Sequence, residues 1–306
     1  MKHLVVIGSA GQDGSYLSEQ AAANGWRVSG FDLGNPAPLS DRAAMSALVT
    51  QLQPDALVYL AAAHHSSEDP ARALGDELVA AEQVHVIGWL HTLDALRAVS
   101  PKARAFYAAS SHCFGEGNGA RITERTPLAP KTPYALTKAH GVELGRLFRA
   151  QGQHVSSGFL FNHESPRRAP RFVSQRICRG AVAAARARSK NEPFTLELGS
   201  TSAVVDWGYA PDYTRAMLQI LEADTPDDYV IASGVPHSVA DWCRLAFGAV
   251  GLEWREFVVE RAERMTRTVA PLIGDSTLLE QRTGWRPATT FEAMVEQMVR
   301  AAEASP

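Results

Sequence analysis

Short apolar runs alternate with amphipathic stretches along the first half of the chain. The runs at 3–8, 26–33, 55–63, 104–110 and 155–161 have the length and composition of buried strands. Between them, residues 14–25, 41–53, 76–99 and 134–152 space their apolar positions as helices do. Strands that alternate with helices form right-handed βαβ units, so the pattern predicts an α/β fold with a doubly wound parallel sheet covered on both faces.

The rhythm changes after Asn162, where polar loops, short strands and further helices predict a smaller α/β lobe. We expect the sheet domain to comprise residues 1–161 plus about 205–225. The lobe is then expected to comprise residues 162–204 and 226–306. No internal repeat or low-complexity linker interrupts this organisation.

Composition narrows the class of protein. The 306 residues are 45% hydrophobic and carry a formal net charge of −3, without a long basic run, which argues against nucleic acid as the main partner. No apolar run reaches the roughly 18 residues of a membrane helix, and no leader pattern opens the chain. Cys113, Cys178 and Cys243 lie far apart, which argues against a metal site or a disulfide framework. These features predict a cytoplasmic protein without a membrane partner.

The first loop carries the signature of a dinucleotide site. Gly8, Gly11 and Gly14 follow a predicted strand and open a helix, whose N-terminal N–H groups suit a pyrophosphate. Asp32 ends the second predicted strand, where a carboxylate accepts hydrogen bonds from a ribose and repels a 2′-phosphate. The pattern favours NAD over NADP in a Rossmann domain. A tight glycine turn with Asp32 on the surface is the alternative.

Tyr134 and Lys138 stand four residues apart and share one helix face. A lysine beside a tyrosine stabilises phenolate, and such a tyrosine can exchange a proton with a sugar hydroxyl during hydride transfer. An ordinary amphipathic helix is the alternative for this common spacing.

Several motifs together resemble one family. "GSAGQDGSYL", "TPYALTKAHG", "LFNHESPRR", "DWGYAPDY", "DDYVIASGVPHSV" and "LIGDSTLLEQRTGWRP" are similar to stretches of the extended short-chain dehydrogenases, and most closely to GDP-mannose 4,6-dehydratase. The resemblance covers nearly the whole chain. It implies a nucleotide-sugar substrate, GDP-linked in this family, and oxidation at sugar C4 as the first step. It also implies a homodimer or homotetramer that pairs the helices at 76–99 and 134–151.

The resemblance also implies roles for individual residues. Ser110 would hydrogen-bond the C4 oxygen, Tyr134 would act as the base for C4, and Lys138 would orient the tyrosine and the cofactor ribose. Together with Tyr134 and Lys138, the implied cofactor-binding residues are Gly8, Gly11, Gln12, Asp13, Gly14, Asp32, Ala61 and Ala62. The implied substrate-binding residues are Ser111, Asn162, His163, Glu164, Arg176, Arg179 and Arg267. Pairing with Arg167 or Arg168 is the alternative for Glu164.

Two positions depart from the family pattern. His112 replaces the glutamate that removes the C5 proton, and Val205 replaces an arginine. An unperturbed imidazole titrates near pH 6.5, so His112 could serve as a substitute base. It could instead bind the sugar in an enzyme that only oxidises or reduces C4, or be a polar residue without a chemical role.

Three functions follow from these alternatives. The first is a dehydratase-type enzyme with His112 as base. The second is a C4 dehydrogenase, reductase or epimerase acting on a GDP-linked hexose or heptose without loss of water. The third is a nucleotide-binding Rossmann protein without turnover, which would need neither Ser110, Tyr134 nor Lys138. His64 and His65 could line the nicotinamide pocket or form a solvated pair, and Cys113, Trp89 and Trp207 are expected in the core.

Overall fold

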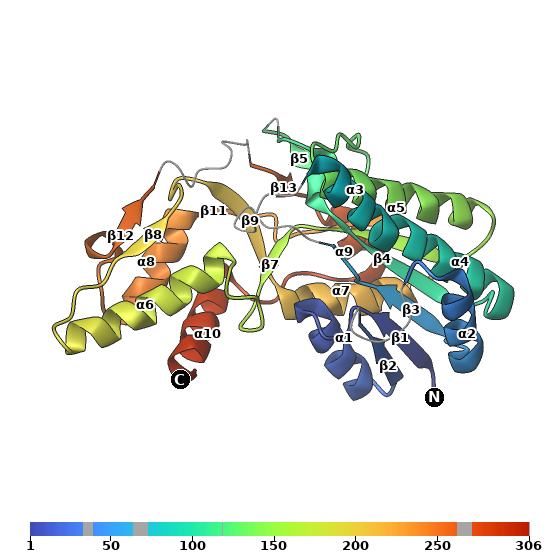
Figure 1. The fold of residues 1–306 in the computed structure, drawn as a ribbon, viewed down its shortest axis with the longest axis horizontal. Helices are drawn as coiled ribbons and strands as arrows, with labels where there is room; N and C mark the ends of the chain where they lie inside the picture. The colour runs from blue at the N-terminus through green and yellow to red at the C-terminus, as the bar shows by residue number, and fades with distance from the viewer. Residues whose placement is uncertain (33–38, 64–72, 118, 262–270, 306) are drawn as a thin grey trace.

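A computed structural model describes residues 1–32, 39–63, 73–117, 119–261 and 271–305 of the chain. Its centre is a six-stranded sheet in the order β10-β6-β4-β3-β1-β2, in which every neighbouring pair is parallel (Figure 1). The strands are β1 (His3–Ile7), β2 (Arg27–Phe31), β3 (Ala56–Tyr59), β4 (Arg104–Ser110), β6 (Val155–Leu160) and β10 (Asp228–Ile231). The predicted doubly wound parallel sheet is confirmed.

Burial explains why these segments form strands. Every residue of β1, β3 and β6 is buried, as expected for central parallel strands that helices cover on both faces. The edge strand β2 is partly exposed along its length.

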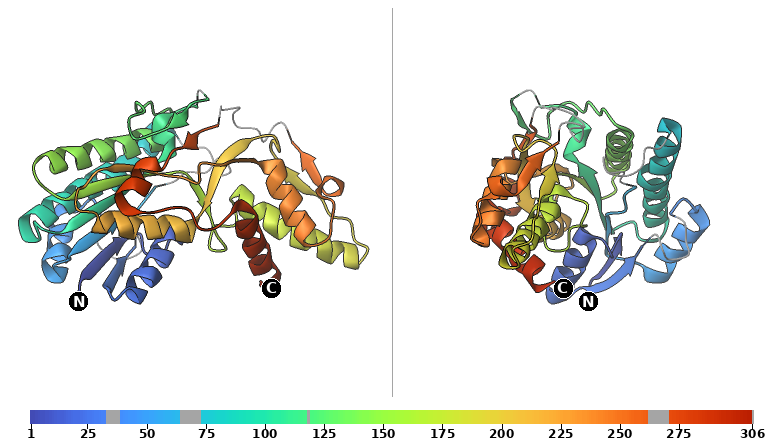
Figure 2. Two further views of the ribbon diagram at one scale, coloured as in Figure 1. Left: turned by 180° about the vertical axis from the view of Figure 1, so that it is seen from behind. Right: turned by 60° about the vertical axis from the view of Figure 1, so that its left-hand side comes forward.

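Helices flank the sheet on two sides (Figure 2). On one side α1 packs against α7, and on the other α4 contacts both α2 and α5. The helices of this domain are α1 (Gln12–Ala23), α2 (Arg42–Leu52), α3 (Leu74–Glu82), α4 (Gly88–Val99), α5 (Pro133–Ala150), α7 (Ala210–Glu222) and α9 (Thr277–Thr283). The predicted helix at 76–99 is a continuous rod in which a π-helical turn, η1 (Gln83–Ile87), separates α3 from α4.

A second part of the molecule extends from the end of the sheet (Figure 1). Its strands β7 (Asn162–Glu164), β9 (Val204–Tyr209) and β11 (Pro236–Ser238) form one small sheet, and β8 (Leu196–Leu198) pairs with β12 (Val258–Glu260). The helices α6 (Val173–Ser189), α8 (Val239–Ala249) and α10 (Phe291–Ala304), with the short turn η3 (Trp254–Glu256), build a separate apolar core around Trp207 and Trp242. The predicted smaller α/β lobe is therefore present.

The domain boundaries differ from those expected for the second half of the chain. Strand β10 lies within 226–306 but joins the six-stranded sheet beside β6, and α9 packs against it. Most of strand β9 (Val204–Tyr209) lies within 205–225, but the strand belongs to the sheet of the lobe. The reason is that parallel pairing joins segments distant in sequence, so the chain crosses between the two cores more often than a simple split predicts.

The connections position a site at the carboxyl ends of the strands. From β1 the chain runs outward to β2 and then crosses back to β3, so the strand order reverses between β1 and β3. Ligands of open α/β sheets bind at such a switch point. The remaining short elements, η2 (Ser111–Phe114), β5 (Arg121–Ile122) and β13 (Ile273–Gly274), lie on this side, where β5 pairs with β13. None of the helices in the described ranges combines the length and the apolarity that crossing a membrane requires.

Candidate active site

The glycine-rich loop after β1 forms a tight turn. Gly8 has a φ of +92°, and a Cβ added to Gly14 would lie 2.2 Å from the Gly8 carbonyl oxygen. Only glycine permits this approach of the first turn of α1 to the loop. The carboxylate of Asp32 accepts hydrogen bonds from the Ser9 hydroxyl at 2.7 Å and the Ala10 amide at 2.9 Å. These contacts shape the loop in the way a pyrophosphate cradle requires.

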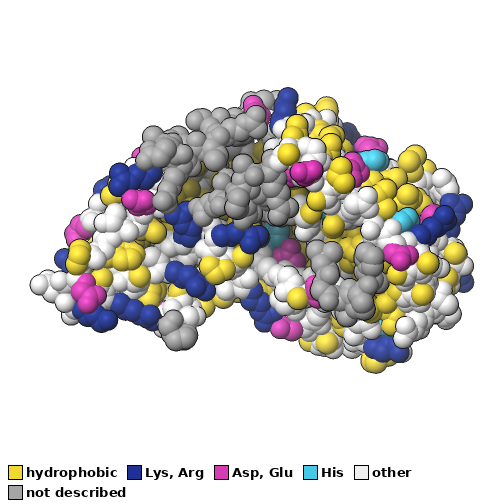
Figure 3. Space-filling model, in the orientation of Figure 1, with side chains coloured by type: hydrophobic (Ala, Val, Ile, Leu, Met, Phe, Trp, Pro, Cys, Tyr) yellow, Lys and Arg dark blue, Asp and Glu magenta, His cyan; other side chains and the backbone are white. Residues whose placement is uncertain are grey.

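A cavity of about 450 Å³ opens beside this loop. It brings together residues from the loop, from the ends of β3, β4 and β6, and from α5. The predicted cofactor or catalytic residues among its lining are Gly11, Gln12, Asp13, Ala62, Ser110, His112, Tyr134 and Lys138. Arg167, Arg168 and Arg171 also line the cavity, although they are not among the predicted site residues. Figure 3 shows Lys and Arg side chains gathered where the two parts of the molecule meet.

Helix α5 carries the predicted catalytic pair, Tyr134 and Lys138. Thr132 caps the helix by accepting a hydrogen bond from the Ala135 amide at 3.2 Å, and Pro133 occupies the first turn. Tyr134 thus lies in the first turn, and Lys138 lies one turn later on the same face. The Lys138 ammonium donates to the Ala108 carbonyl at 2.8 Å and lies 6.0 Å from the centre of the Tyr134 ring.

Burial shifts both pKa values in opposite directions. It lowers the pKa of Lys138 to about 7 and raises the pKa of Tyr134 to about 12. A hydrogen bond with the Ser110 side chain acts on Tyr134 in the opposite sense and favours its phenolate. The site therefore holds a protonated phenol beside a lysine that can change its charge near neutrality.

His112 lies directly after β4, on η2. The Ser110 hydroxyl accepts a hydrogen bond from the His112 amide at 3.2 Å, which fixes the start of this turn. The His112 ring stands edge-on to the Tyr134 ring at 6.2 Å between centres. Loss of solvent around the ring lowers the pKa of His112 below its usual 6.5. The imidazole is therefore neutral near pH 7 and able to accept a proton.

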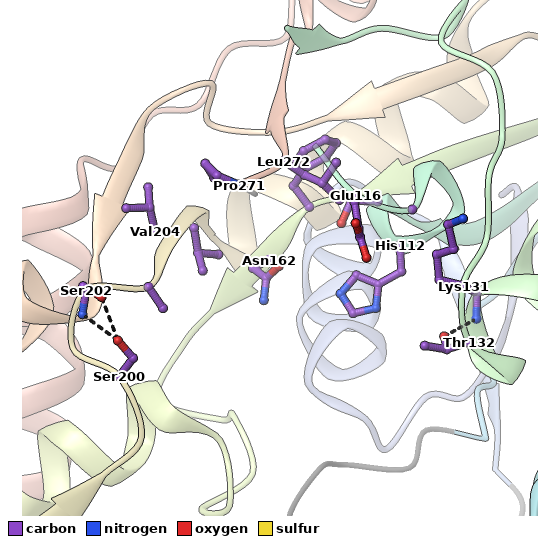
Figure 4. Close-up of a pocket in the computed structure, with 16 residues that line it drawn as sticks. His112, Glu116, Lys131, Thr132, Asn162, Ser200, Ser202, Val204, Pro271 and Leu272 are labelled. Atoms are coloured by element: carbon purple, nitrogen blue, oxygen red, sulfur yellow. Dashed lines mark hydrogen bonds between the residues drawn. The ribbon is translucent and has the colours of Figure 1, made fainter. Parts of the chain in front are cut away.

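A second cavity of about 480 Å³ continues from the first, between the sheet domain and the lobe. Ser111, His112, Phe161 and Asn162 line both cavities and so form their junction. Figure 4 shows the side chains of His112, Glu116 and Asn162 directed into this space. Its far wall is largely apolar and includes Val204, Val205, Pro271 and Leu272.

Glu116 and Lys131 also line this cavity. Neither lies in a motif that can be recognised from the sequence. Glu116 reaches the cavity because the chain turns at Gly115, which has a φ of +76°. A Cβ at Gly115 would lie 2.3 Å from the Ala129 carbonyl oxygen, so this turn needs glycine. The glycine itself was the available signal, but it does not tell which side chain the turn delivers.

His163 links the cofactor loop to the lobe. Its Nε2 lies 2.9 Å from the Asp13 carboxylate, and its Nδ1 lies 2.7 Å from the Phe161 carbonyl oxygen. Both partners are acceptors, so both ring nitrogens donate and the ring is an imidazolium. Burial lowers the pKa of His163, but the Asp13 charge more than compensates and the pKa is raised overall. Here His163 lines the first cavity, on the cofactor side of the junction.

Other predicted substrate residues lie away from the junction. The Glu164 side chain is 2% exposed and is paired with Arg168 at 3.2 Å and with the Ser174 hydroxyl. Arg176 donates to the Glu197 carbonyl at 2.6 Å, and Arg179 lines a separate surface groove on α6. Arg267, like His64 and His65, lies outside the described residues. The structure thus gathers Ser111 and Asn162 at the junction but not Glu164, Arg176 or Arg179.

The remaining motif residues have structural positions. The Asp206 carboxylate accepts hydrogen bonds from the amides of Ser233, Gly234 and Gly274, which ties the lobe sheet to the end of β10. Trp207 and Trp89 are buried in the two cores, and Cys113 is a buried free thiol, as expected.

Comparisons with known proteins agree with this arrangement. The family model described as "GDP-mannose 4,6 dehydratase" matches residues 35–298. "GDP-mannose 4,6 dehydratase 2" of Caenorhabditis elegans is 31% identical over 97% of this chain and 88% of its own length. The chain belongs to the GDP-mannose 4,6 dehydratase family. The resemblance drawn from the motifs is confirmed, and with it the place of the chain among nucleotide-sugar enzymes of the extended short-chain dehydrogenase type.

Solved structures support the fold of this family member. RMD from Pseudomonas aeruginosa, complexed with NADPH, superposes with a TM-score of 0.83 at 23% identity, over 100% of both chains. A dTDP-glucose 4,6-dehydratase from Bacillus anthracis, in complex with NAD, gives a TM-score of 0.82 at 17% identity, over 99% of this chain and 97% of the other. At these identities the likeness establishes the shared architecture.

Proposed function

We propose that this protein oxidises C4 of a GDP-linked sugar with NAD and then eliminates water across C5 and C6. The observation that carries the proposal is the position of His112. It lines both cavities and faces Tyr134 across their junction. Two proton-transfer groups therefore face one point, where a sugar ring can present C4 to the first group and C5 to the second. The family supports a GDP-linked substrate.

The residues of the chain divide the proton chemistry of the first step. Ser110 and Tyr134 hydrogen-bond each other, so a C4 hydroxyl placed between them can pass its proton to the tyrosine oxygen. The phenol first loses its own proton to solvent, and the Lys138 ammonium stabilises the phenolate that then accepts the C4 hydroxyl proton. A bound nicotinamide would supply the hydride-accepting and hydride-donating chemistry that oxidation of C4 and the later reduction of C6 require.

The second step uses a different group. A C4 ketone makes the C5 proton acidic, and the neutral His112 imidazole can remove it. The C6 hydroxyl then leaves as water and takes the proton that the imidazolium carries. The electron pair of the broken C5–H bond becomes the C5–C6 double bond. Saturation of the C5–C6 double bond takes a hydride at C6 and a proton at C5, and the Tyr134 phenol holds the proton that it took from the C4 hydroxyl.

The cradle at the glycine loop fits a dinucleotide. Gly8, Gly11 and Gly14 permit close approach, and Asp32 follows β2 at the position that selects for a free ribose hydroxyl. We therefore expect NAD to bind more tightly than NADP when both are titrated by calorimetry. Asp32→Ala should narrow the difference, because a 2′-phosphate then meets no carboxylate. Equal or tighter binding of NADP to the unaltered protein would contradict the assignment.

Oxidation or reduction of C4 without loss of water is the second candidate. Two departures from the family pattern favour it. Val205, which forms an apolar wall with Val204, stands where the family has an arginine, and His112 stands where the family has a glutamate. A protein that only binds nucleotide is disfavoured, because Ser110, Tyr134 and Lys138 all meet in one cavity.

One assay distinguishes the three functions. The purified protein with NAD is incubated with GDP-mannose and with related GDP-linked hexoses and heptoses, and the products are analysed by mass spectrometry. Loss of one water supports the dehydratase function. Loss of two hydrogens, or an epimer of unchanged mass, supports the second candidate. Binding without any product supports the third and refutes both enzymatic proposals.

A homodimer through α3 and α5 is also proposed. These neighbouring helices expose Leu74, Val79, Leu136 and Leu147, each between 48% and 70% accessible, and exposed apolar patches mark association sites. We expect a dimer by size-exclusion chromatography with light scattering at micromolar concentration. The double variant Val79→Glu and Leu147→Glu should be a monomer.

Val259→Glu is the matched control for this dimer, because Val259 is an exposed valine on β12 in the lobe. It should leave the dimer intact. A monomeric unaltered protein, or a dimer that survives both glutamates, would remove this proposal.

A further inference from the structure

A buried histidine outside the motifs contacts the catalytic tyrosine. His85 has no exposed surface and lies on the π-helical turn η1. Its ring stands edge-on to the Tyr134 ring, at 5.4 Å between centres and 87° between planes. Single π turns inside helices are frequent at functional sites. The turn is held by two core tyrosines, since Tyr59 donates to the Val84 carbonyl and Tyr107 to the His85 carbonyl.

The hydrogen bonds of His85 determine its protonation. The Ala63 amide, which can only donate, lies 2.9 Å from Nε2, so Nε2 accepts and carries no proton. The remaining proton is on Nδ1, which lies 2.7 Å from the Thr137 hydroxyl. Thr137 in turn donates to backbone carbonyls of its own helix, Pro133 at 3.0 Å or Tyr134 at 3.1 Å. The ring is therefore neutral with a defined tautomer.

These contacts join two walls of the cofactor cavity. Ala63 follows β3 beside Ala62, which lines the cavity, and Thr137 lies on α5 between Tyr134 and Lys138. Lys138 reaches the same β3 exit from the other side, because its ammonium lies 3.5 Å from the Ala61 carbonyl oxygen. The distance between the cofactor wall and the phenol therefore depends on the imidazole that bridges them.

We propose that His85 is a positioning residue, a neutral imidazole that holds the exit of β3 and the first turns of α5 in register. It keeps the Tyr134 phenol and the Ala61–Ala63 wall at the separation that hydride and proton transfer require. The inference rests on the proposed function for its consequence in catalysis. The bridge itself, a single tautomer of His85 that joins the exit of β3 to α5, does not depend on that function.

The test compares two variants of His85. His85→Leu removes both hydrogen bonds, whereas His85→Gln keeps a carbonyl oxygen that can accept from the Ala63 amide. We expect the leucine variant to lower kcat for C4 oxidation by about 10²-fold, since small misplacements of reacting groups have effects of this order. NAD binding should weaken, and KM for the sugar nucleotide should change little because the second cavity is untouched. The glutamine variant should recover most of kcat.

His154→Leu is the matched control. His154 directly precedes β6, at the end of the strand away from the site, and its ring hydrogen-bonds the Ala223 carbonyl. It should leave kcat and NAD affinity unchanged. A folded His85→Leu protein, judged by circular dichroism, with unaltered kcat and NAD affinity would overturn the proposal.

Two readouts remain decisive if the leucine variant does not fold or if no GDP-linked sugar is turned over. The first is nitrogen NMR of the His85 ring in the unaltered protein, which should show a protonated Nδ1 and an unprotonated Nε2. A protonated Nε2 would overturn the inference. The second is the NAD affinity of His85→Gln. It should stay within about threefold of the unaltered protein, because the glutamine carbonyl can still accept the hydrogen bond from the Ala63 amide. A greater loss in a folded glutamine variant would count against the bridge to Ala63.

Discussion

Replacement of Tyr134 by phenylalanine should lower the rate of C4 oxidation by about 10²–10⁴-fold, the contribution typical of a general acid–base group. The variant keeps the ring, its edge-on contacts with His85 and His112, and the cap of α5. It loses only the phenolic oxygen through which the C4 hydroxyl can release its proton. NAD affinity should therefore be nearly unchanged.

The measurement for Tyr134→Phe combines calorimetry for NAD with the rate of 4-keto sugar formation in a single turnover. Tyr209→Phe is the matched control, since the Tyr209 hydroxyl bonds Gln297 on the outside of the lobe. That variant should turn over normally. Unchanged turnover in Tyr134→Phe would mean that the Tyr134–Lys138 spacing is an accident of an amphipathic helix.

Replacement of His112 by alanine should abolish water loss and leave C4 oxidation measurable. The two steps use different groups, because the C4 hydroxyl proton passes to Tyr134, whereas the C5 proton leaves only after the ketone has acidified it. His112→Ala should therefore accumulate a 4-keto sugar with its C6 hydroxyl intact, together with reduced cofactor. Mass spectrometry of the product and absorbance of the reduced nicotinamide measure the two steps separately.

The pH dependence supplies a second check on His112. Elimination needs the neutral imidazole, and burial lowers the pKa of this group below 6.5. The rate of water loss should therefore fall as the pH drops through that lowered pKa, and it should not depend on pH above that pKa. His112→Glu restores the family's carboxylate and should retain water loss with the acid limb moved toward about pH 4, the ordinary range of a glutamate.

The His112 hypothesis has clear contrary outcomes. If His112→Ala loses both steps together, or only binds the sugar more weakly, the residue orients the substrate and is not the base. If the unaltered protein forms a 4-keto sugar without losing water, the dehydratase function fails and C4 oxidation or reduction stands.

Much of the fold was predictable because local pattern and sheet topology are linked. Continuous apolar runs at β1 and β3 require burial on both faces, and only a parallel sheet between helices provides it. Gly8, Gly14 and the Tyr134–Lys138 spacing were also recognisable from the chain alone. Each depends on the backbone geometry of a few neighbouring residues, and these local relations are visible in the chain.

The sequence by itself thus determined the doubly wound sheet, the glycine loop and the helix that carries Tyr134 and Lys138, and motif similarity pointed to the family. Tertiary structure alone decided which distant side chains meet. It joined β10 to the main sheet and directed Glu116 into the second cavity through the turn at Gly115. It also bridged His85 to Ala63 and Thr137. Such contacts depend on how helices and strands pack across long stretches of chain, and periodicity within a single element carries no record of them.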